Sequence, residues 1–499
     1  PVIMTSRLVT VLEHITPTQN GDDATLAALK TRLILDSLRA QFIVAPRRLR
    51  EMCSFMLHEM TIGLRPTQDG VPASTLRMLP SYVYKRDAGN ANGIYYALDL
   101  GGTNFRVIRM LVRGGRMVQS LSEKFTIPKS EMSGDADSLF GFIARSVRQF
   151  MVNKDVQGDN DVQNNQTKAL PLGFTFSFPV KQTGISSGEL ISWTKGVTAK
   201  GVEGHDVVKL LQHAFQKQGV NMNVVALCND TVGTLITRYF DDATTEMGVI
   251  LGTGSNACYW EKARNITKDA DIVAFAQRHD SADGHTSEMV INMEFGNFDS
   301  THVSVLPRTQ FDDAIDQASP NRGAQRFEKM ISGMYLGEIS RQVLLYLASM
   351  GVLPASFGSS DRLAKAYSFH SKDNGLISAD RTPGLMDTRQ LLEEHYGVRV
   401  EDERARYIVR EVCTLVIHRA AQLSGMAIAA TLLKTGRQDN ATVAVDGSVF
   451  EKTPGFRAVM QRTIQGLVGR GGADVRLTLT RDGSGFGAAF IAALASQGA

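Results

Sequence analysis

The stretch that decides the fold reads Leu98-Asp99-Leu100-Gly101-Gly102-Thr103-Asn104-Phe105-Arg106-Val107. An apolar, β-rich run begins at Gly93 and leads into the acid, and residues 105–112 again favour a strand. The two glycines therefore lie at a tight turn between strands, where backbone N–H groups can closely face an anion. Thr103 and Asn104 add side-chain donors, and Asp99 is placed to hold a hydrated Mg²⁺ nearby. The stretch predicts a phosphate-binding hairpin, with an ordinary glycine hairpin as the alternative.

A second stretch repeats this design and favours the phosphate interpretation. It reads Met247-Gly248-Val249-Ile250-Leu251-Gly252-Thr253-Gly254-Ser255-Asn256-Ala257-Cys258-Tyr259, an apolar strand, a glycine turn and another strand-like run. Two such hairpins about 150 residues apart suggest two similar halves that face each other across a cleft. A Walker-type phosphate loop, G-x-x-x-x-G-K-[ST], occurs nowhere in the chain.

The bulk properties are those of an ordinary globular protein of more than one domain. The chain has 499 residues, of which 43% are hydrophobic and 21% charged, with a net charge of +3. No lysine or arginine block indicates a nucleic-acid surface, and no apolar run reaches the ~18 residues that span a bilayer. The four cysteines are widely spaced, which favours buried thiols in a reducing compartment over disulfides or zinc.

Two segments carry polar groups beside apolar walls, as expected of a pocket for a polar small molecule. One is the strand-like run 172–180, which contains Ser177-Phe178-Pro179, and the other contains Trp193-Thr194-Lys195-Gly196. Taken singly, each is better explained as a strand or a polar turn. Together they place two hydroxyls and an ammonium in the predicted pocket.

Carboxylates follow or interrupt apolar runs at two further places. The run Val224–Cys228 ends at Asn229-Asp230, and a helix is predicted to open there. Acids at the carboxyl ends of strands in an α/β fold usually point into the ligand crevice, although Asp230 could instead cap the helix. Glu294 lies inside the apolar run 289–298, and a buried carboxylate is costly without a partner or a ligand.

Apolar periodicity predicts the remaining elements. Helices are expected over 24–64 with a break near Pro46, and over 136–152, 201–219, 324–349, 401–434 and from Gly483 to the C-terminus. Residues 443–450 predict a strand followed by the turn Gly447-Ser448. The polar run 153–168 is expected to be a surface loop without chemistry.

In order and spacing, these motifs resemble those of the hexokinase family over roughly residues 78–493. The matching segments are 98–107, 174–179, 193–196, 229–234, 252–259, 291–296, Phe327-Glu328-Lys329-Met330 and 332–338. The length and the polar insertions look most like the glycosomal hexokinases of kinetoplastid (trypanosomatid) parasites. Arg7-Leu8, five residues, then His14-Ile15 resembles an N-terminal peroxisomal address, with isoleucine where leucine is usual. The resemblance thus implies glycosomal import through a receptor, and cytoplasmic residence if the address is not functional.

The resemblance also implies an α/β architecture, the actin-like ATPase or ribonuclease H-like fold. Two lobes with a duplicated hairpin core would flank a cleft that closes when sugar binds. Residues 1–79 would form an N-terminal helical segment packed on the large lobe. The small lobe would comprise 80–228 together with the C-terminal helix 484–499, and the large lobe 229–483.

Matching motifs carry over the following roles. The sugar site would comprise Ser177, Thr194, Lys195, Asn229, Asp230, Asn256, Glu294 and Glu328. Asp230 would be the general base on the 6-hydroxyl, and Lys195 would steady the transferred phosphoryl group. ATP would be held by Asp99, Gly102, Thr103, Asn104, Arg106, Gly252, Thr253, Gly447 and Ser448, with Asp99 binding Mg²⁺ through water. Arg106 could equally form a structural ion pair, and Phe295 stands where the family usually has tryptophan.

The sequence therefore predicts an ATP-dependent kinase that phosphorylates glucose or another hexose, the first step of glycolysis. A non-catalytic sugar sensor on the same fold, a filament-forming or chaperone-type ATPase, and a polyphosphate- or ADP-using kinase are the alternatives. Asp230 and Lys195 argue against the sensor, and Ser177, Thr194 and Glu294 would have no role in the ATPase. The oligomeric state stays open, with a homo-oligomer among the alternatives.

Overall fold

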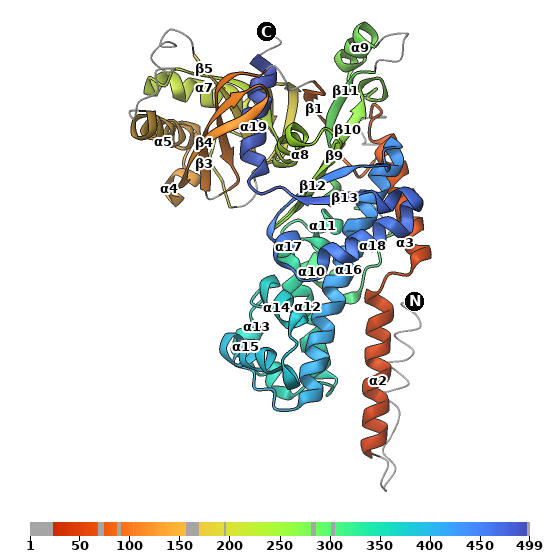
Figure 1. Ribbon diagram of the computed structural model, residues 1–499. Coiled ribbons are helices and arrows are strands. Elements are labelled where there is room, and N and C mark those ends of the chain that lie inside the picture. The colour runs from red at the N-terminus through yellow and green to blue at the C-terminus, as the bar shows by residue number, and fades with distance from the viewer. Residues whose placement is uncertain are drawn as a thin grey trace. The chain divides into compact units, whose positions relative to one another are not determined.

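The computed structural model describes residues 23–67, 74–86, 91–102, 104–155, 169–193, 196–280, 286–300 and 305–496. The chain forms two compact units (Figure 1). Within the described residues, the first unit comprises 23–55, Asp299–Ala429 and Lys452–Leu467, and the second comprises Met56–Phe298, Ala430–Glu451 and 468–496. The predicted lobe boundaries near residues 80, 229 and 483 stay a prediction.

The second unit contains all strands of the described residues. They are β1 (Leu79–Tyr84), β2 (Gly93–Leu100), β3 (Asn104–Arg113), β4 (Arg116–Thr126), β5 (Leu170–Phe176), β6 (Val180–Gly184), β7 (Ser187–Leu190), β8 (Met222–Cys228), β9 (Thr245–Leu251), β10 (Ser255–Lys262), β11 (Glu288–Asn292), β12 (Thr442–Asp446) and β13 (Arg476–Leu479). They form a five-stranded sheet in the order β4-β3-β2-β5-β8, a six-stranded sheet in the order β1-β11-β10-β9-β12-β13, and the β6-β7 hairpin.

The two large sheets share one design, which confirms the predicted duplication. In each, an antiparallel hairpin (β2-β3 or β9-β10) is extended on one side by an antiparallel strand, β4 or β11, and β1 adds a further antiparallel strand beyond β11. On the other side of each hairpin, two strands run parallel to its first strand, namely β5 and β8 in one sheet and β12 and β13 in the other. Both predicted glycine turns therefore occupy the same position in their sheets.

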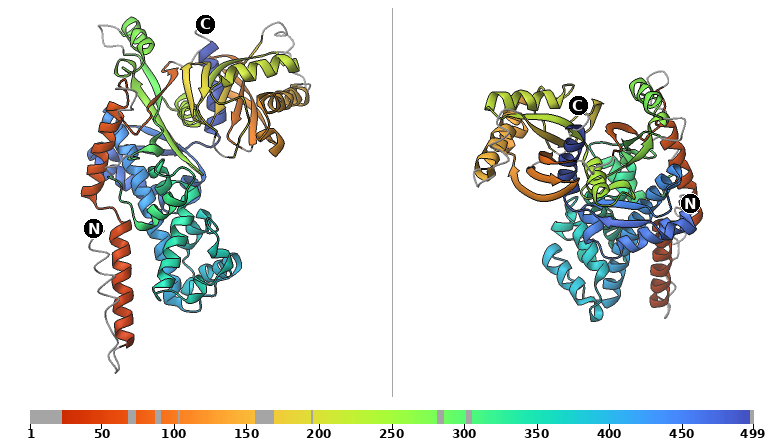
Figure 2. Two further views of the ribbon diagram at one scale, coloured as in Figure 1. Left: turned by 180° about the vertical axis from the view of Figure 1, so that it is seen from behind. Right: turned by 45° about the horizontal axis from the view of Figure 1, so that its top comes forward.

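Helices cover both faces of the five-stranded sheet (Figures 1 and 2). The helices of the second unit are α4 (Lys129–Met132), α5 (Ala136–Asp155), α7 (Val207–Gln218), α8 (Asp230–Asp241), α9 (Ala270–His279) and α19 (Gly483–Ser496). Buried side chains of α5 and α7 pack into the core on one face, and those of α8 and α19 pack into the core on the other. A Cβ on Gly487 would lie 2.0 Å from the carbonyl oxygen of Gly233, so α19 and α8 approach backbone to backbone. The start of α19 also contacts the end of β2, where the Ser484 hydroxyl donates to Asp99.

The first unit is helical in its described part. Its helices are α2 (Asp23–Phe42), α10 (Gln310–Ala318), α11 (Arg326–Ile331), α12 (Gly333–Ser349), α13 (Asp361–Ala364), α14 (Ser371–Ala379) and α15 (Met386–Tyr396). Four helices cross a boundary between the units: α3 (Pro46–Ile62), α16 (Glu403–Thr435), α17 (Ser448–Lys452) and α18 (Phe456–Val468). The predicted break near Pro46 is confirmed, since α2 ends at Phe42 and α3 begins at Pro46.

The single helix predicted over 324–349 is wrong, because α11 and α12 are separate. Ser332 between them has extended backbone angles, φ −90° and ψ 153°. Its N–H still donates to the carbonyl oxygen of Glu328, which closes α11. Gly333 follows, and glycine lowers helix propensity by about 1 kcal/mol relative to alanine. Apolar residues continue through this break because both helices are largely buried.

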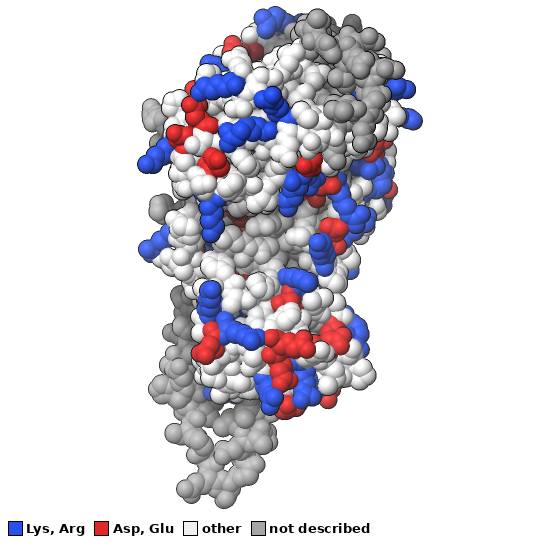
Figure 3. Space-filling model, turned by 90° about the vertical axis from the view of Figure 1, so that its left-hand side faces the viewer, with Lys and Arg blue, Asp and Glu red and all other residues white. Residues whose placement is uncertain are grey.

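One apolar helix and the distribution of surface charge are relevant to membrane and nucleic-acid partners. Helix α16 is long and apolar enough to cross a membrane by length and composition, but 89% of its most apolar window is buried, as is typical of a core helix. On the face drawn in Figure 3, basic and acidic side chains are interspersed. That distribution agrees with the small net charge of the chain. On the described part of this face, no large patch carries charge of a single sign.

Candidate active site

The first hairpin forms the predicted turn. Leu100 pairs with Phe105 at the end of the β2-β3 ladder, and the N–H of Gly101 donates to the carbonyl oxygen of Asn104 at 3.4 Å. Gly102 has φ +143°, a region that side chains rarely adopt, so glycine is required there. Asn104 starts β3 and accepts a hydrogen bond from the Thr126 hydroxyl at 2.8 Å. Thr103 lies outside the described residues.

The start of α19 meets the base of this hairpin. The Ser484 hydroxyl donates to Asp99 Oδ2 at 2.8 Å, and the Thr175 hydroxyl donates to the Ser484 carbonyl oxygen at 2.9 Å. Arg106 forms an ion pair with Asp482 at 2.6 Å, which is the structural role expected as the alternative to phosphate binding. Asp99, predicted to bind Mg²⁺ through water, is thus held at the end of β2 by a hydroxyl.

The second hairpin is pressed against the end of β12. The N–H of Gly252 donates to the Gly254 carbonyl oxygen at 3.0 Å, and Thr253 is exposed at the tip of the turn. A Cβ on Gly447 would lie 2.3 Å from the Leu251 carbonyl oxygen, and Gly447 has φ +113°. The N–H of Gly447 donates to Asp446 Oδ1 at 2.7 Å. Ser448, the first residue of α17, is exposed beside them.

Asn229 and Asp230 lie where β8 passes into α8. Asn229 is the N-cap, and its Oδ1 accepts hydrogen bonds from the Thr231 N–H at 3.0 Å and the Thr231 hydroxyl at 2.7 Å. Asp230 is the first helical residue, and its Oδ1 accepts from the same N–H at 2.8 Å. Because Asn229 fills the capping position, the helix does not need the Asp230 carboxylate as its cap.

A polar cluster connects Asn229 to Glu294. Asn256 on β10 directs its Nδ2 toward Asn229 Oδ1 at 3.3 Å, Asn292 Oδ1 at 2.9 Å and Glu294 Oε1 at 3.1 Å. Asn292, at the end of β11, donates to the same Glu294 oxygen at 3.0 Å. We call Asn229, Asp230, Asn256, Asn292 and Glu294 the amide–carboxylate cluster. It consists of amides and carboxylates that can donate to and accept from adjacent hydroxyls.

The charge of Asp230 acts on both Glu294 and Cys228. Burial raises the pKa of Glu294, and the charge of Asp230 adds to that rise while Asn292, Arg77 and Asn256 oppose it. Burial also raises the pKa of the Cys228 thiol to about 12, with both Asp99 and Asp230 contributing. Glu294 has φ +52°, an uncommon conformation for a residue with a side chain. A buried carboxylate with a raised pKa, near a second acid and on a strained backbone, is typical of a functional site.

The other predicted sugar residues are distributed as follows. Ser177 is buried directly after β5, and its N–H donates to the Leu100 carbonyl oxygen at 3.1 Å, so it adjoins the first hairpin. Thr194 and Lys195 lie outside the described residues. The preceding Trp193 is anchored by its indole N–H to the Ala199 carbonyl oxygen at 2.8 Å. Glu328 lies on α11 in the first unit, and its participation in the sugar site stays a prediction.

Sequence analysis missed three residues of this site. Asn292 could have been found, because residues i and i+2 of a strand share a face and Asn292 precedes Glu294 by two. Asp446, at the end of β12, has its pKa raised by burial and by Asp482, although the Gly447 N–H opposes the rise. Ser484 had no local signal, since it lies 385 residues from its partner Asp99.

Comparisons with known proteins agree with this geometry. Family models described as Hexokinase match residues 34–240 and 246–494. The chain is 41% identical to Hexokinase-1 of Oryza sativa subsp. japonica over 475 residues, which covers 93% of this chain and 91% of that protein. It is 37% identical to Hexokinase-1 of Saccharomyces cerevisiae over 468 residues, covering 93% and 92%.

A solved structure gives the same answer for the fold. The hexokinase of Schistosoma mansoni in complex with glucose superimposes with a TM-score of 0.79 at 34% identity, covering 93% of this chain and 99% of that one. This similarity confirms the predicted actin-like ATPase fold. These matches agree with the duplicated sheets, the two glycine hairpins and the amide–carboxylate cluster. The chain therefore belongs to the hexokinase family and is an enzyme that phosphorylates hexoses with ATP.

Proposed function

We propose that glucose is a substrate of this hexokinase and that the amide–carboxylate cluster holds it. The observation that carries the proposal is the chain of hydrogen bonds from Asn229 through Asn256 to Glu294, with Asp230 beside it. A hexose presents a rim of adjacent hydroxyls, each a donor and an acceptor, and the cluster offers both kinds of partner. Ser177, Thr194, Lys195 and Glu328 complete the proposed sugar site.

Asp230 is proposed as the general base. It takes the proton of the 6-hydroxyl as that oxygen attacks the γ-phosphorus of ATP, the bond to the β-phosphate oxygen breaks, and ADP leaves. Phosphoryl transfer depends mainly on positioning and on stabilising charge, and Lys195 is proposed to contribute the latter. Asp230 is suited to proton transfer because Asn229 has taken over the capping of α8.

The residues of the two hairpins fit a nucleotide with Mg²⁺. Gly102, with Thr103 and Asn104, and Gly252, with Thr253, are proposed to face the phosphates, with Gly447 and Ser448 on the adenosine side. Among the described residues, no group of three or more histidine, cysteine, aspartate or glutamate side chains is arranged to hold a metal. Mg²⁺ commonly keeps several waters and binds one or two carboxylates plus substrate phosphates, so Asp99 suffices as the protein's contribution. When bound, Mg²⁺ would neutralise phosphate charge.

Two further features are proposals that rest on the sequence. Lobe closure around the sugar would exclude water, which otherwise competes as phosphoryl acceptor. The segment Arg7-Leu8-x5-His14 is proposed to direct import into a glycosome; residues 1–22 lie outside the described residues. Replacing Arg7 and His14 by alanine should leave the protein in the cytosol, and unchanged import would contradict the address.

The proposal is tested by measuring ATP turnover with Mg²⁺, with and without glucose, together with glucose 6-phosphate formation. We expect ADP formation to depend on glucose and to match sugar phosphate one for one. Glucose binding without turnover would indicate a sensor, and ATP hydrolysis indifferent to sugar would exclude the proposed sugar site. Parallel assays with ADP and polyphosphate as donors separate the remaining kinases.

A further inference from the structure

Helix α11 carries Glu328, and it is too short to be stable alone. It has six residues, Arg326–Ile331, and isolated helices shorter than about 12 residues are marginal in water. It is separated from α12 by the extended Ser332 and preceded by Gln325, whose φ is +50°. The position of α11, and with it the direction of the Glu328 carboxylate, therefore depends on tertiary contacts.

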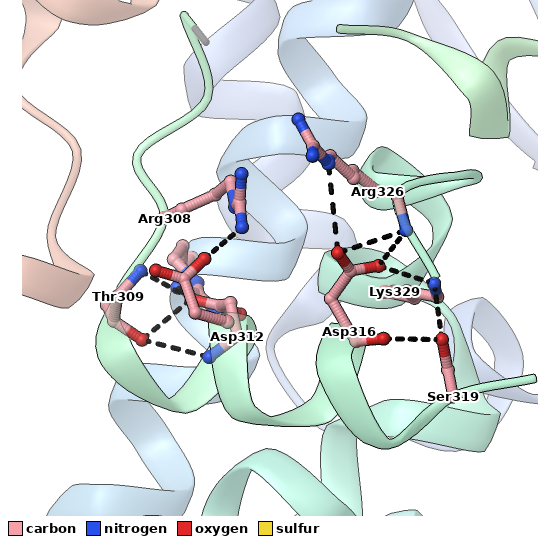
Figure 4. A network of polar contacts seen from close by, with 10 residues as sticks. Arg308, Thr309, Asp312, Asp316, Ser319, Arg326 and Lys329 are labelled. Atoms are coloured by element: carbon pink, nitrogen blue, oxygen red, sulfur yellow. Dashed lines mark hydrogen bonds and ion pairs between the residues drawn. The ribbon is translucent and has the colours of Figure 1, made fainter. Parts of the chain in front are cut away.

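Lys329 supplies a set of short polar contacts that hold α11. Its ammonium donates to Asp316 Oδ1 at 2.7 Å and to the Ser319 hydroxyl at 2.8 Å (Figure 4). It also donates to the Asn321 carbonyl oxygen at 3.0 Å. A lysine ammonium has three N–H donors, so all of them are used. The side chains of Lys329 and Asp316 are each only 4% exposed.

Asp316 extends the same network into the loop before α11. Its Oδ1 and Oδ2 accept from the Gly323 N–H at 3.0 and 3.2 Å, and Arg326 approaches Oδ2 at 3.9 Å. Burial alone would raise the pKa of Asp316, but the hydrogen bonds from Lys329 and Gly323 outweigh burial and lower it. The carboxylate is therefore charged, and one side chain of α10 holds both the loop and α11.

Adjacent helical residues project about 100° apart, so anchoring one side chain fixes the direction of the next. Lys329 is buried against α10, whereas its neighbour Glu328 is only half-buried. The charge of Glu328 reaches Tyr335, where burial first and then this carboxylate raise the pKa to about 12. Rotation of α11 about its axis would move Glu328 away from this arrangement.

We propose that Lys329, through Asp316 and Ser319, is a positioning residue that sets the placement of the Glu328 carboxylate for sugar binding. The inference rests on the proposed role of Glu328 as a sugar ligand. The three N–H donors of Lys329 are all used within the protein, so its role is positioning and not catalysis. The buried ion pair between Lys329 and Asp316 orients Glu328, which lies on a helix too short to hold its own position.

The test is a double-mutant cycle read by steady-state kinetics. Lys329→Met removes the ammonium while keeping a long side chain, and we expect KM for glucose to rise on the order of 10-fold or more, because small misplacements of binding groups are costly. KM for ATP should change by less than about twofold. In a Glu328→Gln background, Lys329→Met should add less than about twofold to KM for glucose, because the two changes act through one carboxylate.

Matched variants separate positioning from general stability. Arg341→Met removes an equally buried cation, paired with Glu338 on α12 with side chains 6% and 3% exposed, and should leave KM for glucose unchanged. Ser319→Ala removes one of three acceptors, so that a folded protein remains available if Lys329→Met does not fold. We expect Ser319→Ala to raise KM for glucose by about 2–5-fold, again only when Glu328 is present.

The outcomes distinguish the two assignments. If Glu328→Gln leaves KM for glucose unchanged, Glu328 is not a sugar ligand and the positioning role falls with it. If Glu328→Gln raises that KM but Lys329→Met and Ser319→Ala do not, only the positioning role is overturned. Equal effects of Lys329→Met with and without the Glu328 carboxylate would show a purely structural role.

Discussion

In the first unit the buried carboxylates of Asp312 and Asp316 are neutralised by cations, whereas in the second unit those of Glu294 and Asp446 are held by amides and backbone N–H groups. Asp312 accepts two hydrogen bonds at 2.7 Å from the guanidinium of Arg419, and Asp316 pairs with Lys329. In the part of the chain that the structure describes, Glu294 and Asp446 have hydrogen-bond donors but no ion pair with lysine or arginine. Burial is the largest influence on all three groups and acts to raise their pKa. For Asp312 the charge and hydrogen bonds of Arg419 outweigh burial and lower the pKa, whereas the pKa of Glu294 and that of Asp446 are raised.

The difference teaches what each set of acids is for. A buried carboxylate with a bidentate arginine has its charge and lone pairs satisfied within the protein, and it serves the fold. A carboxylate held only by neutral donors keeps acceptor capacity for a ligand, at a cost in folding free energy. Removing Glu294 should therefore damage activity, whereas removing the cation that pairs with Asp312 should damage stability.

The largest expected effect is on catalysis by Asp230. Asp230→Ala should lower kcat on the order of 10²–10⁴-fold, because the 6-hydroxyl loses its general base. The melting temperature should change little, since the Asn229 cap of α8 remains. Steady-state kinetics and thermal unfolding of the same preparation check both halves, and near-normal turnover would remove the assignment.

The next effect is on stability in the first unit. Arg419→Met leaves Asp312 buried without its cation and should lower the free energy of unfolding by about 3–5 kcal/mol. Urea unfolding with and without glucose measures this loss. At a temperature where the variant stays folded, KM for both substrates should match the parent; a selective rise in KM for glucose would mean that Arg419 also serves the sugar site.

The smallest expected effect concerns Glu294, whose substitution should change both sugar binding and stability. Glu294→Gln keeps the shape but removes the charge, and KM for glucose should rise on the order of 10–100-fold, the range of hydrogen bonds to charged groups. Because burial raises the pKa of Glu294 above 4.5, the folded state binds more protons than the unfolded state between 4.5 and that raised pKa. The parent therefore loses stability as pH rises through this interval.

The glutamine variant lacks this titration, so its stability relative to the parent should increase over the interval and then stay constant. Urea unfolding at pH 3 to 8 provides the measurement, with Asp316→Asn as the matched control. Asp316 has a lowered pKa, so the stability cost of its substitution should grow as pH rises through the interval between that lowered pKa and 3.8, and then stay constant. A Glu294→Gln variant less stable than the parent at every pH would mean that the carboxylate serves the fold.

Local sequence determined the duplicated hairpins, the Asn229-Asp230 junction between β8 and α8, and the family. These features depend on residues a few positions apart: glycines that permit the turns, alternation that makes strands, and a cap that starts a helix. Only the tertiary structure decided that Ser484 holds Asp99, that Asn292 joins Asn256 to Glu294, and that Ser332 divides α11 from α12. These contacts join residues from separate elements, or depend on competition between helix propensity and packing. The burial that makes each of them strong exists only after the chain has folded.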